Sequence, residues 1–311
     1  MNDRLDPGFV EVADGCFAAR YPEWDVTVGV VVGAAGALVV DTRATAGQGA
    51  RLRDDVRRLA PQAEINWVVN THQHFDHTFG NIAFVGAAVH AHENVASGLV
   101  SAAERIKRLI AERPEPDPGH PAITAQVLRD VVDTELRFPD VTFSSVATID
   151  LGDRYVELVH PGRGHTDGDI VVRVPDAEVL FAGDLVEESG PPVFGADCYP
   201  MDWAASVDLV VGMLAAVTVV VPGHGTPVDR DFVESQRADI SDIAELIRSL
   251  AAQGVPADQA LREGDRAGWP FPAEGLEHAV RRGYEHLTAS GAPLSPAQPP
   301  SGAPSLPLAG L

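Results

Sequence analysis

Four side chains that can bind a metal fall within six residues, and this cluster constrains the chain more than any other stretch. The segment His72-Gln73-His74-Phe75-Asp76-His77 follows shortly after the apolar run Ile65–Val69. That run is short and rich in β-branched residues, so it predicts a buried strand. The histidines then lie on the loop at the carboxyl end of the strand, where α/β proteins usually carry their functional sites.

The spacing within the cluster indicates two adjacent metal sites. In an extended loop, residues two apart point the same way, so His72 and His74 can reach one ion together. Asp76 and His77 diverge from that pair and suit a second ion close by. Imidazole and carboxylate are accepted by zinc, iron and manganese, and this donor set favours zinc. A surface loop rich in histidine by chance is the alternative, and it would need four ligand-type residues in six positions.

The motif His-x-His-x-Asp-His after a strand resembles the signature of the metallo-β-lactamase-fold hydrolases. This resemblance implies an α/β (α+β) fold, a four-layer αβ/βα sandwich with two metal ions between its two sheets. It also implies further ligands downstream, at fixed places in the order of the chain.

Each expected downstream position is filled. His165 follows a glycine-rich stretch, Asp184 follows Gly183 after an apolar run, and His224 lies in Pro222-Gly223-His224. The resemblance implies that the first metal is held by His72, His74 and His165. It assigns Asp76, His77 and His224 to the second metal and gives Asp184 a bridging position. We expect two Zn²⁺ ions, with iron or manganese as alternatives.

The resemblance also implies a mechanism. A hydroxide held between the two ions would attack an electrophilic carbonyl, and Asp76 would act as a catalytic residue by orienting it or accepting its proton. Asp41 ends a predicted strand where relatives often carry an aspartate behind the metal-binding histidines. Its expected role is to accept an imidazole N–H and fix the tautomer. An N-cap for the following helix is the alternative role.

The pattern is closest to the glyoxalase-II-like group, so we expect hydrolysis of an ester, thioester or lactone of a small molecule. A persulfide-oxidising enzyme with one iron is an alternative, and the complete second ligand set counts against it. β-Lactam hydrolysis is a further alternative. It is disfavoured because many β-lactamases carry cysteine or serine near the position of Asp184 and a lysine near the last motifs. Lys107 is the only lysine of this chain.

Charge and hydropathy limit the partners. The chain has 45 acidic and 23 basic residues, a net charge of −22, so a nucleic-acid substrate is disfavoured. No apolar run approaches the roughly 20 residues that span a bilayer, and the first residues lack a basic segment followed by an apolar one. We therefore expect a cytoplasmic protein that acts on a small molecule, with no nucleic-acid or membrane partner. Formation of a homodimer is an open alternative to a monomer.

One hydrolase domain is expected over residues 1–287, with a helical insertion at about 93–135 and C-terminal helices at about 230–287. The insertion is interrupted by prolines and could cover the site as a lid. Two aromatic residues in a Gly/Pro-rich loop, Phe194 and Tyr199, are candidate substrate contacts. Residues 288–311 are rich in Pro, Ala and Ser, which predicts a disordered tail.

Overall fold

Two β-sheets form the centre of the structure, a computed structural model that describes residues 8–290. The first sheet has the strand order β1-β2-β3-β4-β5-β6-β7, and the second has the order β12-β11-β10-β9-β8. The strands of the first sheet are β1 (Val10–Ala13), β2 (Cys16–Arg20), β3 (Thr27–Gly33), β4 (Gly36–Val40), β5 (Ile65–Val69), β6 (Ala88–His92) and β7 (Val141–Phe143). Those of the second are β8 (Val146–Asp150), β9 (Tyr155–Val159), β10 (Val171–Val174), β11 (Val179–Glu187) and β12 (Val219–His224).

Apolar side chains from both sheets share one buried cluster between them. Leu38 and Val69 of the first sheet belong to this cluster together with Leu158 and Phe181 of the second. A Cβ atom on Gly29 would lie 2.3 Å from the Phe181 ring, so this glycine lets the second sheet approach β3 closely. Burying these faces against each other contributes most of the favourable free energy that holds the sheets together.

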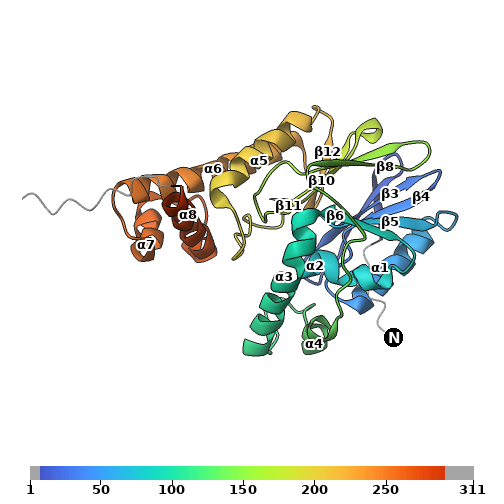
Figure 1. The fold of residues 1–311 in the computed structure, drawn as a ribbon, viewed down its shortest axis with the longest axis horizontal. Coiled ribbons are helices and arrows are strands. Elements are labelled where there is room, and N and C mark those ends of the chain that lie inside the picture. The colour runs from blue at the N-terminus through green and yellow to red at the C-terminus, as the bar shows by residue number, and fades with distance from the viewer. Residues whose placement is uncertain (1–7, 291–311) are drawn as a thin grey trace, which may run out of the picture.

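Helices cover the two outer faces, so the architecture has four layers. The helices are α1 (Ala46–Leu59), α2 (Phe75–Thr78), α3 (Glu93–Glu112), α4 (Ala125–Asp133), α5 (Pro200–Met213), α6 (Arg230–Ala252), α7 (Ala257–Ala267) and α8 (Glu277–Ala289), with short 3-10 helices η1 (Phe79–Ala83), η2 (Pro175–Ala177) and η3 (Ala273–Gly275). Figure 1 shows α1, α3 and α4 on one side of the strands, and α5–α8 on the other, extending to one end of the molecule. The expected αβ/βα sandwich is therefore confirmed.

Helix α1 supports the loop that carries the first histidines. The Thr45 side chain accepts a hydrogen bond from Gln48 N and caps the helix. Further along, Gly49 of α1 packs directly on Gly80 of η1, where a Cβ on Gly80 would lie 1.8 Å from Thr42 O. Only glycine permits this contact between the two backbones. It holds the chain that follows the histidine motif against the end of β4.

The structure corrects one strand prediction. Residues 141–148, which the hydrophobic pattern predicts as one strand, form β7 and β8 in different sheets. β7 pairs in parallel with β6, and β8 pairs antiparallel with β9. Ser144 and Ser145 connect them. A Ser-Ser pair is a weak turn signal, so the local pattern does not reveal that the chain crosses between sheets here.

The C-terminal prediction falls partly outside the described residues. Helix α8 continues to Ala289, two residues beyond the expected end of the domain, and residues 291–311 of the predicted tail are not described. Within residues 8–290, no helix is both long and apolar enough to cross a membrane.

Replacing Gly80 with alanine should lower the free energy of unfolding by about 3 kcal/mol, because the new methyl group collides with rigid backbone. Urea denaturation of the metal-free protein measures this change. Gly212→Ala is the control: Gly212 lies in α5 and a Cβ there has no neighbour within 4 Å. Equal stability of the Gly80→Ala variant and the natural protein would contradict the proposed backbone contact.

Candidate metal centre

Seven ligand-type side chains from four segments meet at one edge of the two sheets. They form two groups, and within each group the ligand atoms all lie within 4.8 Å of one another. The first group contains His72, His74, His165 and Asp184, and the second contains Asp76, His77 and His224. The structure thus brings together all seven residues that the sequence nominates as metal ligands.

Strand order explains why these segments meet. β4 and β5 are parallel, so the loops at their carboxyl ends, which carry Asp41 and the histidine motif, lie side by side. In the second sheet β11 and β12 are also parallel, and His224 ends β12. A β-bridge between Val26 and His224 joins the residue before β3 of the first sheet to β12, an edge strand of the second. The centre therefore lies where the carboxyl ends of strands from both sheets converge.

Gly183 allows the second sheet to reach the histidine loop. Its φ is +53°, and a Cβ there would lie 2.6 Å from Thr71 Cβ. A side chain at this position would be strained and would push the two segments apart. The sequence predicts Asp184 at the end of a strand, but β11 continues through Asp184 to Glu187. The pairing with β12 is irregular on both sides of this glycine, but the strand does not end there.

Asp184 contacts members of both groups. Its Oδ2 lies 3.5 Å from His72 Nε2 and 3.4 Å from His165 Nε2. The same oxygen is 3.2 Å from His224 Nε2, and Oδ1 is 3.3 Å from His77 Nε2. Burial alone would raise the pKa of Asp184, but the surrounding imidazoles of His77, His224 and His72 hold it well below its ordinary value. An ionised carboxylate between the two groups is the arrangement that a bridging ligand requires.

Asp41 and Thr71 fix two of the imidazole rings. Asp41 Oδ2 lies 2.8 Å from His77 Nδ1 and also accepts the Thr71 hydroxyl hydrogen at 2.8 Å. Because the Thr71 hydroxyl donates its hydrogen to Asp41, its Oγ1 accepts a hydrogen bond from His72 Nδ1 at 3.0 Å. Both rings therefore carry a hydrogen on Nδ1 and turn Nε2 toward the cluster. Asp41 adopts a φ of +64°, a strained conformation that the neighbouring hydrogen bonds hold in place.

Backbone carbonyls fix two more rings. His165 Nδ1 lies 3.0 Å from Val193 O, and His224 Nδ1 lies 2.9 Å from Trp24 O. A carbonyl oxygen can only accept, so each Nδ1 carries a hydrogen and each ring turns its Nε2 toward the cluster. Burial would lower the pKa of His224, but the Asp184 carboxylate, 3.2 Å from Nε2, raises it to about 10. Burial lowers the pKa of His165 to about 4, so that ring is neutral and able to bind a metal near pH 7.

His74 is oriented the other way round. Its Nδ1 faces the cluster, 2.9 Å from His165 Nε2, and its Nε2 lies 3.3 Å from both oxygens of Asp197. Asp197 also accepts a hydrogen bond from Arg105 Nη2 at 2.8 Å. Burial would raise the pKa of Asp197, but the hydrogen bond with His74 and the charge of Arg105 outweigh it and keep the carboxyl ionised. Neither Asp197 nor Arg105 belongs to a sequence motif, so neither could be identified from the sequence.

The chemistry of the cluster fits divalent metal ions. Among the described residues, His72 Nε2 and Asp184 Oδ1 are buried and have no hydrogen-bond partner. Buried polar atoms without partners are costly, and both atoms face other ligand-type groups. Imidazole nitrogens with carboxylate oxygens are a donor set that zinc, iron and manganese accept.

A cavity of about 620 Å³ opens onto both groups. Helix α3 forms one wall: Ala102, Arg105, Ile106 and Leu109 are spaced so that they share one face of the helix. The segment 93–135 thus lines the site, and its closure over a substrate remains a prediction. The apolar part of the lining consists of Trp24, Phe75, Ala102, Ile106, Leu109, Ile123, Val193 and Ala196.

Phe194 and Tyr199, the predicted substrate contacts, are not among the residues that line this cavity. Phe194 is 3% exposed and packs against the Trp203 ring, with ring centroids 4.9 Å apart. The Tyr199 ring lies under two guanidinium groups, those of Arg163 at 4.5 Å and Arg282 at 4.8 Å. Both aromatic residues therefore anchor the loop that carries Asp197.

Glu187 also lines the cavity, and the sequence analysis did not single it out. It is 4% exposed, and its Oε1 accepts a hydrogen bond from Val193 N at 2.9 Å. Burial, together with the negative charge of Asp184, raises the pKa of Glu187. The hydrogen bond holds the carbonyl of Val193 in place for His165.

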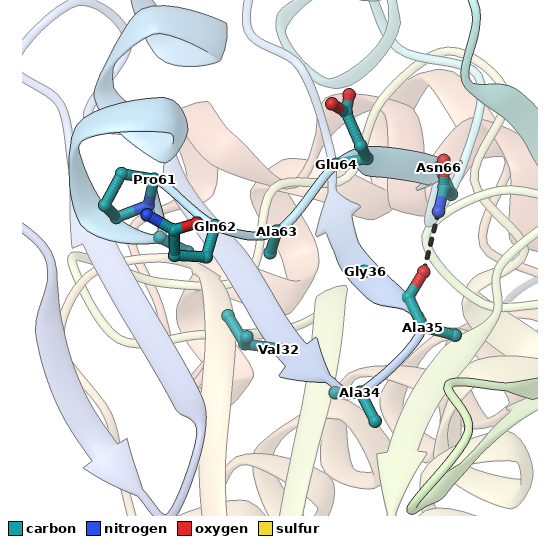
Figure 2. A pocket seen from close by; sticks show the side chains of 11 residues that line it. Val32, Ala34, Ala35, Gly36, Pro61, Gln62, Ala63, Glu64 and Asn66 are labelled. Atoms are coloured by element: carbon teal, nitrogen blue, oxygen red, sulfur yellow. Dashed lines mark hydrogen bonds between the residues drawn. The ribbon is translucent and has the colours of Figure 1, made fainter.

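A second cavity, of about 610 Å³, lies between the β3–β4 turn and the loop before β5 (Figure 2). Its lining is mostly small and apolar, and the Asn66 side chain donates to Ala35 O across it. None of the residues lining it belongs to either ligand group. The cavity beside the histidines is therefore the candidate active site.

Comparison with known proteins identifies relatives that align with part of the chain and solved structures that share its fold. The chain is 38% identical over 91 residues to a metallo-beta-lactamase type 2 of Bacillus cereus, and 25% identical over 112 residues to one of Bacteroides fragilis. The first alignment covers 29% of this chain and 36% of that relative. The second covers 35% of this chain and 45% of that relative.

Two solved structures share the fold. A metallo-beta-lactamase from Pontibacter korlensis superposes with a TM-score of 0.56 and 22% identity, over 75% of this chain and 98% of that one. The inverting sec-alkylsulfatase Pisa1 from Pseudomonas sp. superposes with a TM-score of 0.70 and 18% identity, over 90% of this chain and 50% of that one. A match over 90% of this chain must include part of the C-terminal helices.

The sequence profile of the metallo-beta-lactamase superfamily matches residues 21–224. This segment is more than half of the chain and contains all seven ligand-type residues. The chain belongs to the metallo-beta-lactamase superfamily.

Proposed function

We propose that this protein is a hydrolase with two metal ions that cleaves an ester, thioester or lactone of a small molecule. The observation that carries the proposal is the convergence of imidazole nitrogens and the Asp184 carboxylate beside a cavity of about 620 Å³. In this account His72, His74 and His165 hold one ion, and Asp76, His77 and His224 hold the other. Asp184 contacts both ligand groups.

Zn²⁺ is the metal that this donor set favours, with iron or manganese as alternatives. When bound, a pair of such ions polarises the scissile group and makes a water molecule acidic enough to act as a nucleophile near pH 7. Asp76 lines the cavity beside the clustered imidazoles, with its Oδ2 3.6 Å from His224 Nε2. In the proposed reaction its carboxylate accepts the proton that the attacking water loses.

The cavity lining favours a substrate with an apolar portion. Ile106, Leu109 and Val193 form part of its wall, and Leu109 and Val193 are about half exposed, at 49% and 57%. Arg105 is the only arginine or lysine among the lining residues, and it is already paired with Asp197. These features support an uncharged acyl compound over a strongly anionic one.

β-Lactam hydrolysis is a second candidate because the Bacillus cereus relative, 38% identical over the aligned segment, is a metallo-beta-lactamase type 2. A β-lactam is a cyclic amide, and its hydrolysis needs the same polarised carbonyl and activated water. An iron-dependent oxidation, the third possibility raised by the ligand set, would require only one ion.

Metal content and substrate choice should be measured together. We expect elemental analysis to find two equivalents of zinc, and we expect turnover of thioesters or lactones that chelator treatment abolishes and added zinc restores. The panel should include a chromogenic cephalosporin and a secondary alkyl sulfate. One equivalent of iron without hydrolysis would contradict the proposal, and turnover of the cephalosporin alone would establish the second candidate.

Replacing Asp184 with alanine should lower kcat/KM by at least about 100-fold, since loss of a residue that only orients a ligand already costs 10–100-fold. Metal content should fall at the same time. The exposed Asp208, which pairs with Arg237 at 2.7 Å, provides the matched control, Asp208→Ala. An Asp184→Ala variant with normal turnover and normal metal content would exclude the bridging role.

Truncating the α3 wall should affect binding more than chemistry. The double variant Ile106→Ala/Leu109→Ala removes apolar surface from the cavity, so KM for a substrate with a long acyl chain should rise about 10-fold with little change in kcat. Val100→Ala is the control, because Val100 is an exposed residue of the same helix that does not line the cavity. An unchanged KM would show that the substrate does not contact this wall.

A further inference from the structure

We propose that Asp197 is a positioning residue that fixes the tautomer of His74 against a competing donor, Arg105. The proposal concerns the same site and rests on the proposed metal-dependent function for its purpose. Neither residue lies in the sequence motif, and both come from segments remote from the histidine loop: Arg105 from helix α3 and Asp197 from the chain between β11 and α5.

The orientation of His74 creates the need for such a residue. His72, His77, His165 and His224 have their Nδ1 atoms held by Thr71, Asp41 and two carbonyl oxygens and point Nε2 at the cluster. His74 reverses this arrangement and points Nδ1 at the cluster, 2.9 Å from His165 Nε2. To bind a metal through Nδ1, the ring must carry its hydrogen on Nε2.

Two neighbours of His74 Nε2 favour opposite tautomers. Asp197 places both carboxylate oxygens 3.3 Å away, and a carboxylate can only accept, so it stabilises the Nε2–H form. Arg105 places Nη2 at 3.3 Å, and a guanidinium can only donate, so it stabilises a lone pair on Nε2. With a lone pair on Nε2, the hydrogen would lie on Nδ1 and would bond to His165 Nε2 in place of a metal.

Asp197 resolves this competition because it also binds the competing donor. Arg105 Nη2 donates to Asp197 Oδ2 at 2.8 Å, a shorter contact than its 3.3 Å approach to His74. Gln73 Nε2 contributes a third, longer contact to the same carboxylate at 3.4 Å. Removal of Asp197 would therefore do more than loosen the ring. It would release Arg105 to stabilise the tautomer that cannot bind the metal.

Two substitutions, made singly and together, test this role of Asp197. Asp197→Ala alone should lower the affinity of the first metal site about 10–100-fold. Arg105→Met alone should change it by less than about threefold. The double variant should bind metal more tightly than Asp197→Ala, because the competing donor is gone. A purely structural ion pair would give the reverse: the double variant would be as impaired as Asp197→Ala or more so.

The affinity of each site is measured by competition between a chromophoric chelator and the metal-free protein for zinc. Asp208→Ala is the control for loss of a surface ion pair. The second site, with Asp76, His77 and His224, should keep its affinity within about threefold. Any of three results would overturn the proposal. These are a loss of zinc affinity below threefold at the first site of Asp197→Ala, an equal loss of affinity at both sites, and a double variant that binds zinc no more tightly than Asp197→Ala.

Imidazole ¹⁵N NMR of the metal-free protein at pH 8 separates this proposal from the proposed function. We expect His74 to carry its hydrogen on Nε2 in the natural protein and on Nδ1 in Asp197→Ala, with Nε2–H recovered in part in the double variant. The same tautomer in all three proteins would refute the role of Asp197. A natural protein with the expected tautomer that hydrolyses no member of the substrate panel would refute the function alone. Asp197→Asn, which keeps an accepting oxygen, should be intermediate, and it serves if the alanine variant does not fold.

Discussion

Five imidazole rings can bind metal ions in one small buried volume only if each keeps a hydrogen on the side away from the centre. In this protein every ring has an acceptor on its outer side: Thr71 for His72, Asp197 for His74, Asp41 for His77, Val193 O for His165 and Trp24 O for His224. These outer contacts turn the other nitrogen of each ring toward the centre. The site's capacity to bind metal, and with it the proposed chemistry, depends on that pattern.

The fold is arranged so that these acceptors reach the rings from both sheets. Asp41 follows β4 and Trp24 precedes β3, while Val193 and Asp197 belong to the chain between β11 and α5. Close contacts at Gly80, against the Thr42 backbone, and at Gly183, against the Thr71 side chain, bring the supporting segments together. The arrangement buries polar atoms without partners, at His72 Nε2 and Asp184 Oδ1, which costs stability in the metal-free protein. Metal binding would offset that cost, so folding and metal affinity are linked.

Sequence reasoning recovered what is encoded locally. The ligand-type residues stand in short motifs at or near strand ends, so their positions and the four-layer sandwich could be predicted from pattern and family resemblance. Among the supporting contacts, the one from Asp41 was expected from the family resemblance. The contacts to His165, His224 and His74 could not be predicted, since two are made by backbone carbonyls, which have no residue signature, and Asp197 reaches His74 across 123 positions of sequence. The same limit explains why Phe194 was expected to touch substrate. The sequence around an aromatic loop residue does not distinguish one that faces a cavity from one that packs on another ring, as Phe194 does on Trp203. Similarly, β7 and β8 are both short strands, and they differ in the strands with which they pair, which the local sequence does not reveal.

The central claim is that seven residues hold two metal ions at one site, and anomalous diffraction from crystals of the zinc-loaded protein at the zinc absorption edge tests it most directly. The account predicts two anomalous peaks. One should be coordinated by His72, His74 and His165, the other by Asp76, His77 and His224, with Asp184 in contact with both. A single peak, or zinc bound to residues outside this set, would contradict the account.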